Sequence, residues 1–269
     1  MNRETSTFPP PAQVPNLWNA FWGLWYLTSR RFFTIRYWIV LLSFSGLLFF
    51  IGTRVVAHNA PASEFVSWAT GLYLNCLVPI LSFISCAGAL RDDLKGGVGD
   101  YLFTRPVRRD VFLCFRYVTQ MLAIQFDFLF MFGVMMGVGV VVRVEHLASV
   151  LPVLLGGQIL LAAVFASLGI LCAVLTSRYV VLGILYVGIV EMGLGSLATQ
   201  VNQIAMTPHV TGIVNALIPA LTGASASISK AGEIAGHLLW LGGFLAAALS
   251  LSAFVFSRQE RSGARAQET

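Results

Sequence analysis

Residues 151–176 read LPVLLGGQILLAAVFASLGILCAVLT. No charged side chain interrupts this stretch. About 20 apolar residues in an α-helix are enough to cross the roughly 30 Å hydrocarbon layer of a bilayer. The stretch therefore predicts a transmembrane helix.

Stretches of the same kind recur along the chain. Hydrophobic residues make up 57% of the 269 residues and charged residues only 11%, whereas a soluble domain carries about a quarter charged residues. Lipid must therefore be the main solvent. The sequence predicts an all-α membrane protein with about six transmembrane helices. The predicted spans are Tyr37–Val56, Val66–Leu90, Val111–Val142, Leu151–Thr176, Tyr179–Gln200 and Ile234–Phe256.

Basic residues are distributed unevenly between the two sides of this arrangement. Only Arg54, Arg143 and Lys230 fall on the side of the first, third and fifth connections. Cytoplasmic connections are enriched in lysine and arginine, so we expect both termini in the cytoplasm and the protein in the cytoplasmic (inner) membrane. The same enrichment explains the net charge of +5 without a nucleic-acid partner. The other basic residues are Arg3, Arg30, Arg31, Arg36, Arg91, Lys95, Arg105, Arg108, Arg109, Arg116, Arg178, Arg258, Arg261 and Arg265.

The segment before the first span carries an aromatic stripe. Trp18, Phe21, Trp22 and Trp25 follow the i, i+3, i+4, i+7 spacing of one helical face. Tryptophan prefers the headgroup region of a bilayer, so residues 1–36 are interpreted as a tail followed by an amphipathic helix on the inner leaflet. The alternative is an aromatic extension of the first span.

The remaining organisation is simple. We interpret residues 37–256 as one six-span domain and residues 257–269 as a cytoplasmic basic tail. Residues 201–233 are only moderately polar and contain Pro208 and Pro219. They predict a re-entrant or surface-lying helical hairpin on the outer face, before the last span.

Two small-residue patterns predict close helix packing, within the chain or between subunits. They are Gly133-x-x-x-Gly137 and Gly232-x-x-x-Gly236. Neither pattern indicates which of these two kinds of contact it serves.

The second connection, residues 91–110, is the most charged part of the chain and begins RDDLKGGVGDYLFTRPVRR. An orientation signal alone would explain its basic residues. It would not explain the apolar run Tyr101-Leu102-Phe103, which is costly to leave exposed to water. The connection therefore predicts a docking surface.

The order of residues in this connection resembles the cytoplasmic loop of type-2 ABC exporter permeases, and the overall plan of spans is also similar. Val98 stands where members of that family often carry threonine. The resemblance implies a permease subunit of an ABC transporter, an exporter, which pairs with a second permease copy or a homologous permease. It also implies a separate ABC ATPase docked on this loop. The matching residues are Asp92, Asp93, Gly97, Tyr101, Leu102, Arg105, Pro106, Val107 and Arg109.

The chain has no G-x-x-x-x-G-K-[ST] phosphate-binding loop, and its only lysines are Lys95 and Lys230. If transport is driven by ATP, the partner ATPase must bind ATP–Mg. We therefore expect no ATPase site, no other catalytic site, no metal and no cofactor in this chain, and membrane lipid as its surroundings.

Among the polar residues inside the predicted spans, four are candidates for a function: Arg116, Gln120, Asp127 and Glu191. The first three fall on one stripe of a helix, but eleven residues separate Arg116 from Asp127, too far for direct pairing. Intramembrane acids are functional candidates by default, and a structural role is the alternative. They leave two other functions open: an ion-coupled secondary transporter that uses Asp127 or Glu191, or a membrane scaffold without transport.

Overall fold

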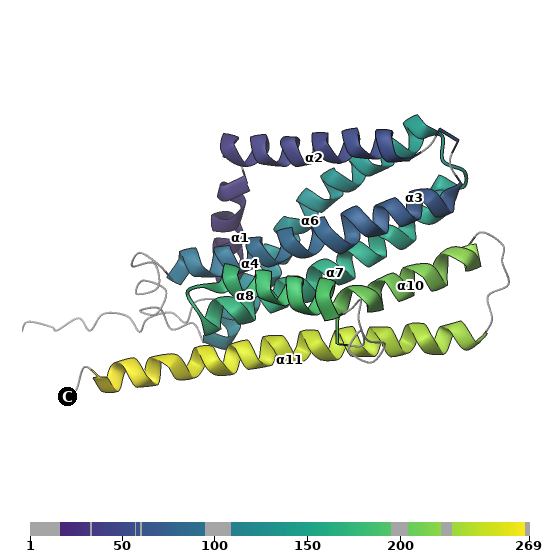
Figure 1. The fold of residues 1–269 in the computed structure, drawn as a ribbon. Helices are drawn as coiled ribbons and strands as arrows, with labels where there is room; N and C mark the ends of the chain where they lie inside the picture. Colours follow the sequence, from purple (N-terminus) through teal and green to yellow (C-terminus); the bar gives the residue numbers. More distant parts are fainter. Residues whose placement is uncertain are drawn as a thin grey trace, which may run out of the picture.

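The computed structural model describes residues 17–32, 34–56, 58–59, 61–94, 109–194, 204–221 and 228–266. In these ranges every regular element is a helix, which confirms the predicted all-α class (Figure 1). Elements labelled η are π-helical, with wider turns closed by i→i+5 hydrogen bonds. The elements are α1 (Leu17–Phe32), α2 (Ile35–Val55), α3 (Ala62–Trp68), η1 (Ala69–Leu77), α4 (Val78–Leu94), α6 (Arg109–Val142), α7 (Leu147–Leu175), α8 (Tyr179–Leu185), η2 (Tyr186–Leu194), α10 (Met206–Leu221) and α11 (Ile228–Ala266).

Within the described ranges, five helices are long and apolar enough to cross a membrane, which supports a multi-pass membrane protein. The stretch predicted as the fifth span, from Tyr179 onward, forms α8 and η2, and its apolar helix from Tyr179 to Glu191 is shorter than the other candidates. The count of six spans stays a prediction. The five candidate spans are Tyr37–Val55, Ala62–Leu94, Asp110–Val142, Leu147–Leu175 and Ala231–Arg258.

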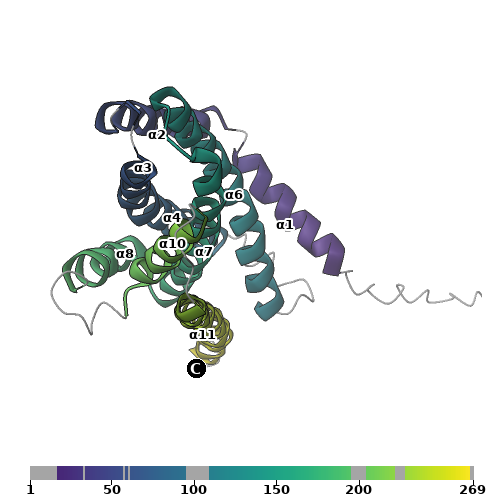
Figure 2. The ribbon, with the colours of Figure 1, turned by 90° about the vertical axis from the view of Figure 1, so that its right-hand side faces the viewer.

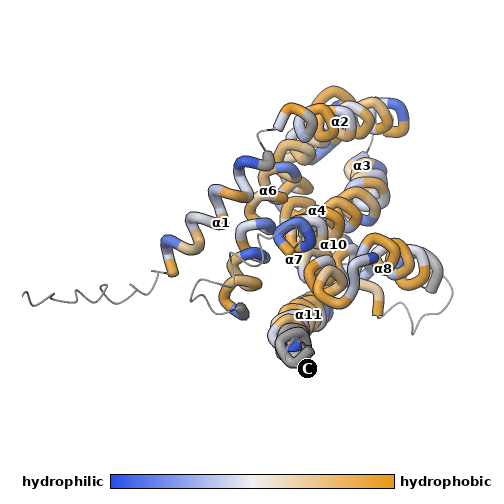
Figure 3. The backbone as a smooth tube through the Cα atoms, turned by 90° about the vertical axis from the view of Figure 1, so that its left-hand side faces the viewer, coloured by the Kyte–Doolittle hydropathy of each residue, from blue (hydrophilic) through white to orange (hydrophobic). Residues whose placement is uncertain are grey.

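Helix α7 forms the centre of the bundle (Figure 2). It packs against α4, α6, α10 and α11. In its most apolar 18-residue stretch 72% is buried, whereas the corresponding shares are 22% for α2 and 17% for α11. The two peripheral helices are nevertheless strongly hydrophobic (Figure 3). An apolar face without a protein neighbour fits a helix that contacts lipid.

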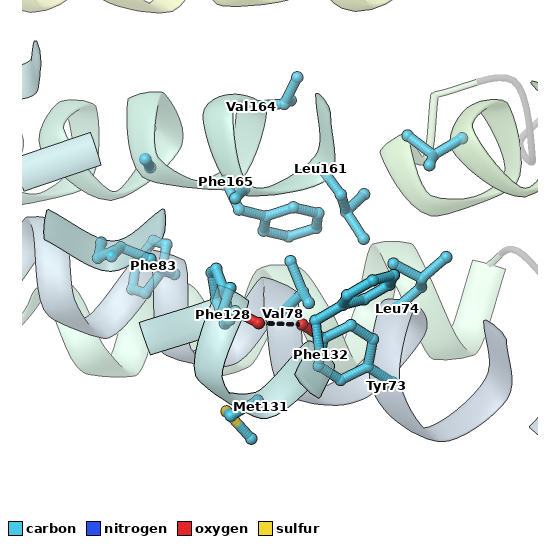
Figure 4. Close-up of a cluster of buried hydrophobic side chains, with 14 of the residues drawn as sticks. Tyr73, Leu74, Val78, Phe83, Phe128, Met131, Phe132, Leu161, Val164 and Phe165 are labelled. Atoms are coloured by element: carbon cyan, nitrogen blue, oxygen red, sulfur yellow. Dashed lines mark hydrogen bonds between the residues drawn. The ribbon is translucent and has the colours of Figure 1, made fainter. Parts of the chain in front are cut away.

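The core lies between α4, α6 and α7, where aromatic side chains from all three helices interdigitate (Figure 4). Helices α4 and α7 approach closely at Gly169, because a Cβ built there would lie 2.6 Å from the backbone oxygen of Phe83. Within this chain the predicted small-residue patterns do not bring helices this close, and a Cβ built at Gly137 would lie 4.0 Å from the Phe49 ring. Gly133, Gly232 and Gly236 have no neighbouring atom within 4 Å of a built Cβ in the described structure.

Helix α1 runs across the bundle, whereas the apolar spans run along it (Figure 1). It contacts α6 and meets α2 near its own C-terminal end. This arrangement agrees with a helix that lies at a membrane surface. We call the end of the bundle where α4 ends and α6 begins the loop end.

Helix α10 occupies part of the predicted hairpin, residues 201–233. It packs against α7 and against α11, and so lies inside the bundle beside two candidate spans. The re-entrant and the surface-lying form of the hairpin both stay predictions.

Candidate functional site

A buried ion pair joins α4 to α6 at the loop end. Arg116 Nε lies 2.7 Å from Asp93 Oδ2, and the two side chains are 1% and 4% exposed. A buried charge is tolerated when it is paired and hydrogen-bonded. Asp93 stands one residue before the end of α4, and Arg116 lies in the first turns of α6.

The same arginine also reaches α1. Its Nη1 donates a hydrogen bond of 2.6 Å to Thr28 Oγ1, and its Nη2 donates one of 3.1 Å to the backbone oxygen of Ala89. The Thr28 hydroxyl in turn donates to the backbone oxygen of Leu24 at 2.8 Å. We call Thr28, Ala89, Asp93 and Arg116 the Arg116 cluster. It ties three helices together through one guanidinium group.

The predicted docking residues surround this cluster in sequence. Asp92 is exposed on the last turn of α4, whereas Asp93 is buried against Arg116. Arg109 begins α6, but its side chain is outside the described part. Gly97, Tyr101, Leu102, Phe103, Arg105 and Pro106 lie outside the described residues.

The aromatic stripe of α1 divides between two environments. Phe21 packs edge-on against Phe115, with ring centroids 5.7 Å apart, and Trp25 lies 6.4 Å from Phe126, both on α6. Trp18 and Trp22 remain exposed. Phe21 and Trp25 therefore hold α1 on the bundle, and the exposed faces of Trp18 and Trp22 suit contact with a headgroup region.

Asp127 lies on the wall of a cavity of about 490 Å³ between α1, α2 and α6. The Tyr37 hydroxyl donates a hydrogen bond to its carboxylate. Gln120 is buried between this residue and the Arg116 cluster along α6. The three residues of the predicted polar stripe all lie on α6, and its two charged members have different partners.

Glu191 binds the start of α10. Its Oε1 accepts from the backbone N–H of Met206 at 2.9 Å, and its Oε2 accepts from that of Thr207 at 3.3 Å. The first N–H groups of a helix have no partner within the helix, and a negative charge there is favourable. The Tyr186 hydroxyl donates to Oε1 at 3.1 Å. Residues five apart meet in this way because they lie in π-helix η2.

A buried polar network in the core was not predicted. The Tyr73 hydroxyl donates to Gln158 Oε1 at 2.6 Å and lies 3.1 Å from the backbone oxygen of Phe128 (Figure 4). Gln158 Nε2 donates to Gln125 Oε1 at 3.2 Å. The lone amide of the 151–176 stretch was the available signal, but its partners lie on other helices. The network fixes the rotation of α7 against η1 and α6.

A histidine pair joins α10 to α11 and was also missed. His209 Nδ1 and His237 Nδ1 are 2.7 Å apart, so one donates and the other accepts. Trp240 stacks on His209 with ring centroids 4.4 Å apart. Among the described residues, no group of three or more potential metal ligands accompanies this pair.

Searches of protein-family models and of curated protein sequences found no match to this chain. We therefore infer its function from the described geometry and from the motif around residues 92–109. The Arg116 cluster is the feature at which the two coincide, because Asp93 belongs to both.

Proposed function

We propose that the chain is the permease subunit of an ABC transporter, an exporter driven by a separate ATPase that docks on residues 91–110. The supporting observation is the Arg116 cluster. It links the helix that enters this connection, the helix that leaves it, and α1. A force applied to the connection therefore acts on all three helices at once.

The mechanism follows from the burial of that cluster. ATP–Mg is held by the ATPase, whose closure would push on the connection and move the end of α4. Asp93 cannot separate from Arg116 without leaving two uncompensated buried charges, which would cost about 3–5 kcal/mol. The end of α4, the start of α6 and the middle of α1 should therefore move as one unit, and switch the permease between inward-facing and outward-facing states.

The proposed assembly contains two permease chains, identical or homologous, above two ATPase chains. The apolar exposed faces of α2 and α11 supply the surfaces for lipid and for a second permease. Asp93 contributes to docking by fixing the end of α4, whereas Asp92, which is exposed, would contact the ATPase.

Changing Tyr101, Leu102 and Phe103 together to serine tests the docking role. Apolar and aromatic anchors dominate protein interfaces, and losing one costs about 2 kcal/mol or more. We expect the variant to insert and fold normally but to lose at least about tenfold of the ATPase that co-purifies with it. The ATPases to test are any P-loop proteins that genes beside this one encode.

The matched control changes His58 and Glu145 to serine, since both are exposed and lie in the connections at the opposite end of the bundle. Its co-purified ATPase should equal that of the parent. If the loop variant also retains the parent amount, the ATPase does not dock there.

Membrane orientation gives a second test of this arrangement. Reporter fusions after Lys95 and after Arg178 are expected to be cytoplasmic, because these connections carry most of the basic residues. Fusions at Asn59, Glu145 and Asn215 are expected to be external. A cytoplasmic signal at Asn215 would contradict six spans with both termini inside.

An ion-coupled carrier is the second candidate function. Asp127 favours it, because this carboxylate lies at a cavity and so is accessible to an ion. Glu191 does not, because both of its oxygens already accept hydrogen bonds from α10.

A further inference from the structure

The cavity beside Asp127 has the size of a small-molecule site. Its volume of about 490 Å³ lies within the roughly 300–1,000 Å³ of such sites. Three helices form it, and each contributes at least one aromatic side chain. The residues that carry the argument are Trp25, Tyr37, Trp38, Phe126, Asp127 and Phe130.

The side chains that line this cavity carry negative charge and no positive charge among the described residues. Among the described residues that line it, Asp127 is the only carboxylate and none is basic. A carboxylate offers about four acceptor positions, and the Tyr37 hydroxyl fills one of them. Apolar walls make the remaining acceptors costly to leave without a partner. A cationic ligand would remove that cost.

A smaller cavity of about 150 Å³ lies on the other side of the same carboxylate. It shares Tyr37, Leu41 and Asp127 with the larger one and reaches Ser85 on α4. Asp127 and Tyr37 therefore form a polar boundary between two apolar spaces. A ligand with its charge at this boundary would have room for apolar groups beside it.

We propose that this cavity binds hydrophobic organic cations, in which an ammonium or phosphonium centre carries an apolar body. Asp127 supplies the opposite charge, and the aromatic rings supply apolar contact and cation–π attraction. A zwitterionic phospholipid is less suited, because its phosphate meets no basic partner among the described lining residues. Binding of such a cation needs no ATPase, whereas its transport rests on the proposed function.

The position of α1 connects this cavity to the Arg116 cluster. Trp25 and Ser29 of α1 line the cavity, and Thr28 between them accepts the hydrogen bond from Arg116. A movement of the cluster would displace one wall of the cavity. Ligand binding and events at the loop end are thereby mechanically linked.

The test measures binding of radiolabelled tetraphenylphosphonium to the purified full chain in the neutral detergent dodecyl maltoside. Tetraphenylborate, an anion of nearly the same shape, is the matched ligand. We expect saturable binding of the cation and none of the anion. Asp127→Asn should weaken cation binding by at least about tenfold, because it removes the charge and leaves the shape. Glu145→Gln, which changes an exposed acid at the opposite end, should leave it unchanged.

A second variant keeps the test decisive if Asp127→Asn does not fold. Trp38 has an exposed side chain, so Trp38→Ala should fold, and it should weaken cation binding by about threefold to tenfold. Equal binding of cation and anion, or unchanged affinity in both variants, would overturn the proposal. Displacement of the cation by phosphatidylethanolamine but not by phosphatidylglycerol would instead assign the cavity to a lipid headgroup. Because no ATPase is present, failure here would leave the docking hypothesis standing.

Discussion

Arg116→Met is expected to destabilise the protein by about 3–5 kcal/mol, because it leaves the buried Asp93 carboxylate without its partner. The side chains of both residues are almost fully buried, so water cannot replace the lost contact. Thermal unfolding in detergent, followed by size-exclusion chromatography of the remaining soluble protein, measures the loss. Arg178→Met removes an exposed arginine near the same end and should change stability little.

A double variant separates the two effects on stability, that of an unpaired buried charge and that of altered packing. Asp93→Leu combined with Arg116→Met removes both charges, and replacing a buried ion pair by apolar residues is often neutral or stabilising. Thr28 keeps its own hydrogen bond to Leu24, so no buried hydroxyl loses its acceptor. We expect the double variant to recover most of the lost stability. If it is no more stable than the single variant, the ion pair is not the cause of the loss.

The double variant also tests the coupling role, since it folds without the link from α4 to α1. Spin labels at Asn19 and Ile39, both exposed, would report the distance between α1 and α2 in a background without native cysteines. ATP should change this distance in the complex of parent permease and ATPase, and should leave it unchanged in the double variant. An equal response in both proteins would contradict transmission through the cluster.

The class of the fold was predictable because it depends on composition along short windows. A charge-free run such as residues 151–176 can be recognised without knowing its neighbours. The position of close helix contact was not predictable in the same way. The spacing Gly133-x-x-x-Gly137 favours such contact, yet α4 and α7 meet closely at Gly169, which lies outside the two glycine patterns singled out in the sequence.

The candidate site shows a similar division. Arg116, Asp127 and Glu191 could be identified because a charge inside an apolar run is visible in the sequence. Their partners could not, because they depend on long-range packing: Thr28 is 88 residues from Arg116. The contact of Glu191 with Tyr186 was hidden for a different reason. It needs the wide turn of a π-helix, whereas the α-helical repeat places residues five apart on different faces.

Glu191→Ala is expected to destabilise the protein by about 2–4 kcal/mol, since a charged acceptor of three hydrogen bonds is lost and bonds of this kind contribute roughly 1.5–3 kcal/mol each. The N–H groups of Met206 and Thr207 would be left at the start of α10 without an acceptor inside the bundle. Thermal unfolding in detergent measures this, and Glu145→Ala, at an exposed acid, should change it little.

Glu191→Gln then tests the one form of the ion-coupled carrier in which Glu191, rather than Asp127, holds the coupling ion. Glutamine keeps one acceptor oxygen for the start of α10 but cannot take up or release a proton or hold an ion by charge. An ABC permease draws its energy from the ATPase, so transport per folded molecule should stay within about tenfold of the parent, or 1.4 kcal/mol of barrier. A carrier that loads its coupling ion on Glu191 would lose coupled transport entirely. Such a complete loss in a well-folded Glu191→Gln protein would favour the ion-coupled carrier. A glutamate with only a structural role needs its hydrogen bonds to α10, and it does not need to gain or lose a proton.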